Sequence, residues 1–363
     1  MKLRLGSTLP LLCLLLGGPA LAEDSLRDKA KGFFEPIPQI APAFLAEPTT
    51  PEKIALGKML FFDPRLSENR DLSCSRCHNP SLGGVSGQSL SAGHPGELGG
   101  RNVLTVFNAV FNAAQYWDGR AASLKEQVEA SVMSSPAALL KTRGGPMAVS
   151  PAVTALAKQH VVERFKTIPG YVNAFKRAFP AATDPVTYDN VARAIAQFEA
   201  TLITPGAPFD RWLTGNDAAL SPAQLQGLAL FIEKGCAGCH SGVNLGGTSY
   251  ARFGVAQSPS AELLPPDDWG RATVTKKVED KYVFKIPNLR NVELTAPYFH
   301  SGGTDDLKEA VAVMASTQLG VTLAPEEIAS IDAFLKSLTG SAPQIVLPIL
   351  PPNAPRAQAH PGN

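Results

Sequence analysis

Two short blocks of the chain each place two thiols and an imidazole at a spacing suited to covalent haem attachment. Both read Cys-x-x-Cys-His, the first over residues 74–78 and the second over residues 236–240. In this pattern the thiols become thioethers to the porphyrin vinyl groups, and the adjacent histidine supplies an axial nitrogen to iron. The residues are Cys74, Cys77 and His78 in the first block and Cys236, Cys239 and His240 in the second.

A Cys-x-x-Cys pair by itself also fits a thioredoxin-like redox centre or a zinc site. The chain has five cysteines, and the one outside the two blocks is Cys13. Two blocks that use all the later cysteine, each followed directly by histidine, favour haem over these alternatives. The sequence therefore predicts two covalently bound haem c groups.

The N-terminal residues 1–22 have the pattern of a cleavable signal peptide. Lys2 and Arg4 form a short basic region, an apolar run covers residues 9–16, and Ala20 and Ala22 make a small-x-small cleavage site. The apolar run is too short to span a bilayer, and no later segment has the length and hydropathy to do so. We expect a mature protein without a membrane span, exported to the periplasm, where haem c is attached.

Length and charge restrict the class of protein. The chain has 363 residues and a formal net charge of +1. This length suits two or three domains with proper cores. The near-neutral charge shows no basic stripe of the kind that binds nucleic acid, so no nucleic-acid partner is expected.

Each haem block follows a predicted capped helix. Before the first block, Thr49 and Glu52 have capping-box spacing, and Asp63-Pro64 ends the helix. Before the second, Ser221 and Gln224 repeat the spacing with Pro222 between them, and Gly235 ends the helix. A capped apolar helix followed by a haem block is the entry helix expected of a cytochrome c domain.

Further patterns predict a mainly α fold of two cytochrome c-type haem domains in tandem, with short strands only. Apolar residues at helical spacing predict helices over residues 191–202 and 328–338. Prolines at 36, 38 and 42 predict no helix between the signal segment and Pro48. We place the domains at residues 23–205 and 206–340, followed by a proline-rich C-terminal arm over residues 341–363.

The sixth ligand of each iron comes from a small pool of histidines and methionines. His94 lies in a glycine- and serine-rich stretch, close enough in sequence to the first block to cover a haem face, although a lone loop histidine is usually a surface residue. Met314 ends a short apolar stretch that is compatible with either ligation or core packing. We predict His94 and Met314 as the distal ligands.

The chain resembles the bacterial di-haem cytochrome c peroxidases, whose wider family includes the MauG-like enzymes. The similarity covers roughly residues 40 to 350 and keeps the order and spacing of motifs across both halves. Besides the haem blocks, the matching stretches are Ser91–His94, Arg101-Asn102, Tyr116–Arg120, Gly242–Gly247, Pro287–Val292, Leu294–His300 and Glu309–Val311.

The resemblance implies a role for each haem. The N-terminal domain would hold a low-potential, peroxidatic haem with a displaceable distal ligand at His94. The C-terminal domain would hold a high-potential haem, where electrons enter, with Met314 as distal ligand, because a soft thioether favours Fe(II). Trp117 matches the tryptophan between the two haems and would carry electrons, or serve as interdomain packing.

The resemblance also implies a calcium ion and partners. The calcium ligands would be the Asn102 side chain and the carbonyls of Thr295 and Pro297, which are hard oxygen donors. The substrate would be hydrogen peroxide, and the electron donor a small c-type cytochrome or a cupredoxin. Relatives are commonly homodimers, and no feature of this sequence argues for or against a dimer.

One position departs from the family pattern. In the family, a Gln and a Glu ten residues apart line the peroxide pocket, where a general acid–base group moves a proton between the peroxide oxygens. Gln127 matches the first, but Ala137 stands at the second. We therefore predict a periplasmic cytochrome c peroxidase, with two alternatives: a MauG-like oxidase that modifies a partner protein, and a di-haem electron carrier or redox sensor without turnover.

Overall fold

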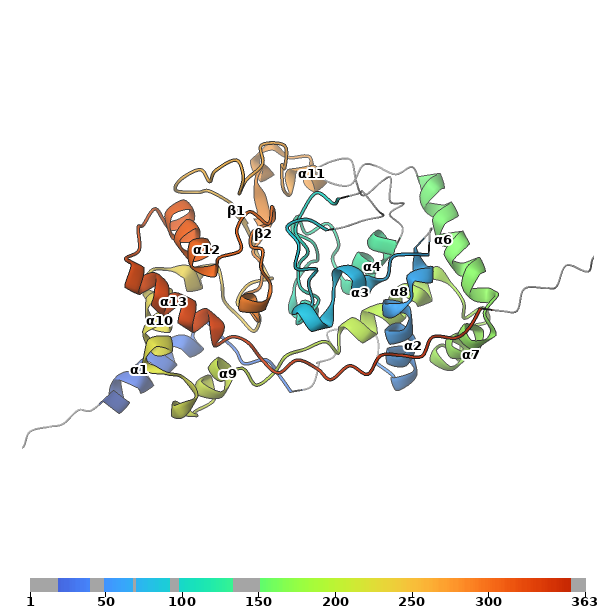
Figure 1. Ribbon diagram of the computed structural model, residues 1–363, viewed down its shortest axis with the longest axis horizontal. Coiled ribbons are helices and arrows are strands. Elements are labelled where there is room, and N and C mark those ends of the chain that lie inside the picture. The colour runs from blue at the N-terminus through green and yellow to red at the C-terminus, as the bar shows by residue number, and fades with distance from the viewer. Residues whose placement is uncertain (1–18, 40–48, 68–69, 92–97, 133–150, 354–363) are drawn as a thin grey trace, which may run out of the picture.

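The computed structural model describes residues 19–39, 49–67, 70–91, 98–132 and 151–353, without the side chains of residues 19–24 and 151–154. These residues are mainly helical, as predicted (Figure 1). The helices are α1 (Pro19–Lys31), α2 (Pro51–Phe62), α3 (Cys74–Cys77), α4 (Leu124–Val132), α6 (Pro151–Lys166), α7 (Pro169–Ala178), α8 (Tyr188–Glu199), α9 (Pro208–Leu213), α10 (Pro222–Glu233), α11 (Ala272–Thr275), α12 (Leu307–Met314) and α13 (Pro325–Lys336). Two strands, β1 (Tyr250–Arg252) and β2 (Val283–Lys285), and several short 3-10 and π-helical turns complete the regular structure of the described part.

The helices form two groups, each around its own hydrophobic core. One core joins α2, α6, α7 and α8, with Phe61, Phe165, Phe175 and Ile195 among its buried side chains. The other joins α9, α10 and α13, with Trp212, Leu228 and Phe334 at its centre. Figure 1 shows the two groups at opposite ends of the molecule, with the strands and irregular segments between them. The helices predicted over residues 191–202 and 328–338 are confirmed as α8 and α13.

The caps of the two entry helices explain where these helices begin. Ser221 accepts a hydrogen bond from the Gln224 amide, and the Gln224 side chain accepts one from the Ser221 amide, so the predicted capping box is confirmed. In the first half the cap is Thr50, which accepts from the Lys53 amide, and not Thr49. The cap lies at Thr50 because Pro51 occupies the first helical position, where no amide hydrogen is needed.

The prediction of no helix before Pro48 was wrong, because α1 extends to Lys31. The prolines at 36 and 38 begin only after this helix has ended, so they do not interrupt it. From α1, Arg27 donates to the Trp212 carbonyl, while Ala30 and Phe34 belong to the second core. The first described residues of the predicted 23–205 domain thus pack on the second half of the molecule.

The C-terminal arm crosses in the opposite direction. After α13, residues 341–353 run without regular structure back to the first half of the molecule (Figure 1). Arg65 donates to the Pro351 carbonyl and to the Asn353 side chain, and Ile345 packs against the first core. Both ends of the described chain therefore tie the two halves together.

The two strands fix the segments that lie between the two helix groups. They pair antiparallel, with Tyr250 opposite Lys285 and Arg252 opposite Val283. The Lys285 amide continues the pairing by donating to the Trp117 carbonyl at 2.7 Å. This small sheet therefore anchors Trp117, a residue of the first half, to the second half.

Candidate functional site: two haem-attachment blocks and the region between them

The second block lies at the end of α10, on the wall of a cavity. Gly235 takes a left-handed conformation (φ 96°) that turns the chain, and Cys236–Gly238 form a single 3-10 turn. Cys236, Cys239 and His240 line a cavity of about 230 Å³. The thiol of Cys239 is exposed whereas His240 is buried, so the block has one edge at the surface and its imidazole inside.

His240 is held in the orientation of a metal ligand. Its Nδ1 lies 3.2 Å from the Leu245 carbonyl oxygen, which can only accept, so the proton belongs on Nδ1 and the lone pair on Nε2. Burial lowers the pKa of His240 to about 4, which keeps the ring neutral. A neutral imidazole with its outer nitrogen hydrogen-bonded to a carbonyl is the form that ligates iron.

Met314 contributes to the same cavity from another element. It is the last residue of α12, and the chain continues as a π-helical turn over Ala315–Leu319. Such turns are frequent at functional sites. Its partly buried side chain packs against the cluster of Phe253, Leu263 and Phe284, and the cavity wall includes it. The structure thus brings Cys236, Cys239, His240 and Met314 around one space.

The rest of this cavity suits a flat, apolar macrocycle. Apart from a few polar atoms, aromatic and aliphatic side chains make up its walls, among them Phe231, Phe253, Phe284, Leu289 and Ile331. Two thiols, a neutral imidazole, a thioether and apolar walls are the donor set and surroundings of a haem c. In this chain, Cys236 and Cys239 would attach that haem and His240 and Met314 would ligate its iron.

The first block forms the short helix α3 at the edge of the first core. Cys74 packs against that core, and burial, then the neighbouring Glu199, raise the pKa of its thiol. Burial lowers the pKa of His78, and backbone contacts with Gly84 and Leu104 oppose this shift. The donor set again fits a haem c.

Polar groups from α4 and α8 gather near the first block. Gln127 Nε2 donates to Ser131 Oγ at 2.9 Å, and Tyr116 Oη lies 2.6 Å from the same oxygen. Glu199 is buried near Cys74 and Tyr116, and burial raises its pKa to about 8. His94 and Ala137, by contrast, lie outside the described residues, so their predicted roles stay predictions.

Trp117 lies between the two halves and is held by both. Its Nε1 donates to the Asn102 carbonyl at 3.0 Å, and its own carbonyl accepts from Lys285. Its ring makes an edge contact with His300, with 6.1 Å between centroids, and it lines the second cavity. Its predicted role as an electron conduit stays a prediction.

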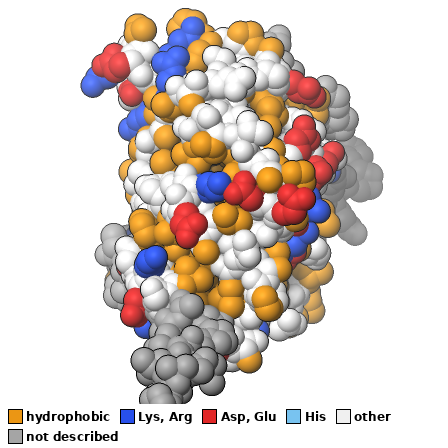
Figure 2. All heavy atoms as spheres, turned by 90° about the vertical axis from the view of Figure 1, so that its left-hand side faces the viewer, with side chains coloured by type: hydrophobic (Ala, Val, Ile, Leu, Met, Phe, Trp, Pro, Cys, Tyr) orange, Lys and Arg blue, Asp and Glu red, His pale blue; other side chains and the backbone are white. Residues whose placement is uncertain are grey.

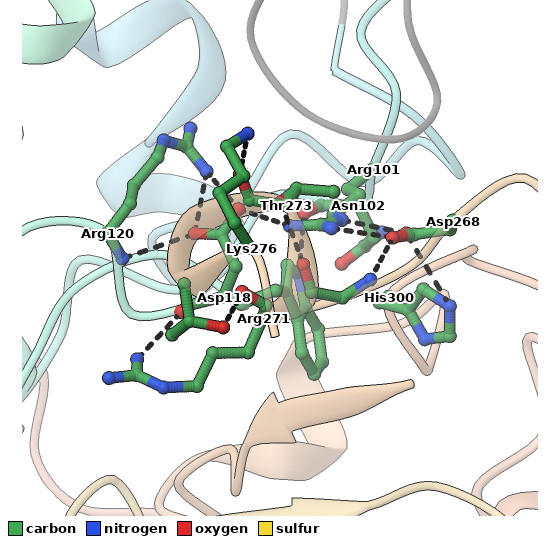
Figure 3. Close-up of polar contacts among 12 residues, drawn as sticks. Arg101, Asn102, Asp118, Arg120, Asp268, Arg271, Thr273, Lys276 and His300 are labelled. Atoms are coloured by element: carbon green, nitrogen blue, oxygen red, sulfur yellow. Dashed lines mark hydrogen bonds and ion pairs between the residues drawn. The ribbon is translucent and has the colours of Figure 1, made fainter. Parts of the chain in front are cut away.

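A buried charge network joins the halves (Figure 3), and it includes Asp118, the chain neighbour of Trp117. Arg101 binds both carboxylate oxygens of Asp268, at 2.6 and 2.7 Å, and donates to Asp118 at 2.8 Å. Burial disfavours the charge on Arg101, but the carboxylates of Asp268 and Asp118 outweigh it and raise its pKa. Breaking such a buried pair leaves an uncompensated charge, so the network resists separation of the halves.

The three predicted calcium ligands line the same cavity. Asn102, Thr295 and Pro297 all contribute to its wall. The Asn102 Nδ2 donates to the Gln88 and Ser89 carbonyls, which leaves Oδ1 as its free ligand atom. The described residues contain no group of three or more His, Cys, Asp or Glu side chains that could hold a metal ion. An amide–carbonyl oxygen set remains compatible with calcium.

The family profile of the di-haem cytochrome c peroxidases matches residues 51–218. A cytochrome c551 peroxidase from Pseudomonas aeruginosa is 47% identical over 345 residues, covering 94% of this chain and 95% of that protein. This chain belongs to the di-haem cytochrome c peroxidase family. The methylamine utilization protein MauG from Methylorubrum extorquens is more distant, with 34% identity over 86% of each chain.

Among solved structures, a MauG-like protein associated with microbial copper homeostasis superposes with a TM-score of 0.69 at 26% identity. It covers 84% of this chain and 95% of its own. The chain belongs to a di-haem family and has two blocks that fit haem c. It therefore binds two haem c groups. Among its described residues, no helix is both long and apolar enough to cross a membrane.

The sequence did not predict two polar residues of the cavity. They are Lys285 and Asn288, which are buried and line the cavity beside the second block. The one available signal was Lys285, a single charge within the apolar stretch Val283–Pro287. A lysine buried in a short apolar strand needs a partner for its charge, and the amino-acid sequence does not identify that partner.

Proposed function

We propose that this chain is a periplasmic peroxidase that reduces hydrogen peroxide to water with electrons from a small c-type cytochrome or a cupredoxin. When bound, the two haem c groups supply the redox chemistry, since they accept, hold and pass on the electrons. The observation that carries the proposal is the single cavity that contains Cys236, Cys239, His240 and Met314 and has Trp117 in its wall. It would provide one electron site, with Trp117 in its wall as the route toward the first block.

The surface of the second block suits an electron donor. Gly238 and Cys239 are exposed, so the attached edge of the cofactor would lie within short reach of a docked protein. Figure 2 shows the end of the molecule formed by the second half, where hydrophobic side chains mix with scattered acidic and basic ones. Neither sign of charge dominates this face, which favours a small donor held by apolar contacts and a few local ion pairs.

Trp117 would pass electrons between the halves. Hydrogen bonds from Lys285 and to Asn102 hold it at both its backbone and its indole nitrogen. The buried Arg101–Asp268 pair beside it keeps the two halves at a constant separation. A rigid bridge of this kind is what repeated electron transfer needs, because the rate depends on a constant distance.

The peroxide site would form around the first block. His94 would cover the iron of that block until the other haem is reduced, and would then move away. Gln127 would bind the peroxide, with Ser131 and Tyr116 fixing its amide through the shared hydroxyl. Ala137 stands where the family has a carboxylate, and a positioned acid–base group contributes a hundred-fold or more to proton transfer, on the order of 10²–10⁴.

Steady-state oxidation of a reduced c-type cytochrome by hydrogen peroxide tests this function, with wild type and Ala137→Glu compared. We expect measurable turnover in the wild type and an increase of about a hundred-fold in the variant if proton transfer limits the rate. Turnover in the variant alone would favour the electron-carrier alternative for the natural chain. Absence of turnover in both would contradict the proposed function.

We also propose the interdomain calcium ion at Asn102, Thr295 and Pro297. These oxygen donors come from both halves, so a bound cation would tie Trp117 and its neighbours in place. Treatment with a calcium chelator should slow electron transfer between the haems, and added calcium should restore it. Substitution Asn102→Ala should reproduce the chelator's effect without recovery.

A further inference from the structure

Lys285 occupies an unusual place for a lysine. It ends β2 between Phe284 and Ile286, its side chain is 1% exposed, and it lines the cavity beside the second block. Its backbone amide donates to the Trp117 carbonyl and β2 pairs with β1, so the backbone is fixed at this position. The Nζ atom of Lys285 lies in the interior.

The protein itself provides no counter-charge for this group. Among the described residues, Lys285 Nζ has neither a hydrogen-bond partner nor a carboxylate within ion-pair distance. Burial consequently lowers its pKa to about 8. Burying an unpaired cation is strongly unfavourable, so a lysine retained at such a position indicates an anionic ligand in the cavity.

A second buried donor points the same way. The Nδ2 atom of Asn288 also lacks a hydrogen-bond partner in the described part of the chain. Asn288 is 8% exposed and lines the same cavity. His300 completes this polar side, with its Nε2 3.8 Å from Asp268, which is too long for a hydrogen bond (Figure 3). An otherwise apolar cavity with an ammonium and an amide at one side matches an apolar ring that carries carboxylates.

We propose that Lys285 forms an ion pair with a propionate of the haem attached at Cys236 and Cys239, assisted by Asn288. The inference rests on haem attachment at this block. The ammonium would neutralise the propionate and leave the iron in a more positive environment, which stabilises the reduced state. Lys285 is thus a positioning residue that raises the reduction potential of the second haem and keeps its carboxylate edge next to Trp117.

Spectroelectrochemical titration of the holoprotein tests this pair. Lys285→Met removes the charge at similar volume, Lys285→Arg keeps it, and Lys234→Met serves as the matched control. Lys234 lines the same cavity, but its Nζ is paired with Glu327 at 2.7 Å. In Lys285→Met we expect the equilibrium constant for reduction of the second haem to fall about tenfold or more, equivalent to about 59 mV for one electron. In Lys285→Arg and Lys234→Met it should stay within about threefold of wild type.

The outcomes separate the pair from the haem assignment. A Lys285→Met protein with two haems and an unchanged second potential would overturn the ion pair, whereas a wild-type protein with fewer than two haems would overturn the attachment itself. If Lys285→Met does not take up the haem, redox-difference infrared spectra of the Lys234→Met protein test the ion pair instead. These spectra are recorded with and without ¹⁵N-labelled lysine. An isotope-sensitive ammonium band on reduction of the second haem supports the pair, and its absence contradicts it.

Discussion

The two halves of the molecule share one scaffold but surround their haem blocks differently. In each, a capped helix packs tightly through a glycine against a later helix. A Cβ added at Gly57 of α2 would lie 1.9 Å from the Ala194 carbonyl oxygen of α8. One added at Gly227 of α10 would lie 1.8 Å from the Ser330 oxygen of α13. The same close helix pair therefore supports both blocks.

The differences lie in the groups that face the blocks. In the second half, a carbonyl orients His240 and the buried ionisable group is a base, Lys285. In the first half, the buried ionisable group near the block is an acid, Glu199, and its raised pKa of about 8 keeps it protonated near neutral pH. A nearby cation favours reduced iron, whereas a protonated acid adds no charge that would do so. One scaffold can thus hold two irons at unequal potential by changing charge and ligands.

The largest expected effect is the loss of one haem at a time. Replacing both thiols of a block with alanine, in Cys74→Ala with Cys77→Ala or in Cys236→Ala with Cys239→Ala, should lower the haem content from two per chain to one. Both double variants should lose peroxidase turnover, but only the first should still accept electrons from a reduced donor. Pyridine haemochrome spectra and stopped-flow donor oxidation measure this. Donor oxidation by the second variant would reverse our assignment of the halves.

Met314→His should move the two potentials closer together. Imidazole stabilises Fe(II) less than a thioether does, so the potential of the second haem should fall by on the order of 0.1 V or more, within the roughly 0.8 V span that axial ligands control. Gln318→His is the control, since Gln318 lines the same cavity one helical turn later. A potentiometric titration in which Met314→His matches the control would exclude Met314 as a ligand.

The shared glycine contacts predict smaller changes in stability. Gly57→Ala and Gly227→Ala should each push a helix pair apart and lower the free energy of unfolding by about 1–3 kcal/mol. Gly238→Ala should have little effect, because nothing lies within 4 Å of its added Cβ. Denaturant unfolding followed by circular dichroism compares the three. Equal stability of all three variants would mean that the two helix pairs are not closely packed.

The smallest effect concerns the acid of the first half. Burial raises the pKa of Glu199 to about 8, against about 4.3 in an unfolded chain. Between these values the folded protein holds a proton that the unfolded chain releases, so stability should fall as pH rises from about 4.3 to 8. Glu199→Gln should flatten this decline, whereas Glu233→Gln, at an exposed position, should not. Identical pH profiles for wild type and Glu199→Gln would show that this carboxyl is not buried in the folded protein.

Several features of the fold could be predicted because they depend on residues close together in the chain. Both haem blocks, the Ser221–Gln224 capping box and the helices α8 and α13 follow from local spacing. The first cap was misplaced by one residue, because Thr49 and Thr50 offer the same side chain and only the backbone at Pro51 decides between them. The prediction of no helix there was wrong because the prolines at 36 and 38 follow α1 and do not interrupt it.

The sequence by itself determined the attachment chemistry: two thiols and a histidine within five residues need only a local turn to present a haem site. The tertiary structure alone decided what surrounds that chemistry. Arg101 meets Asp268 across 167 positions of the chain, α1 joins the second core, and Lys285 faces the same cavity as Met314 and Trp117. Contacts between residues so far apart are set by how the two cores pack, and no local spacing encodes that packing.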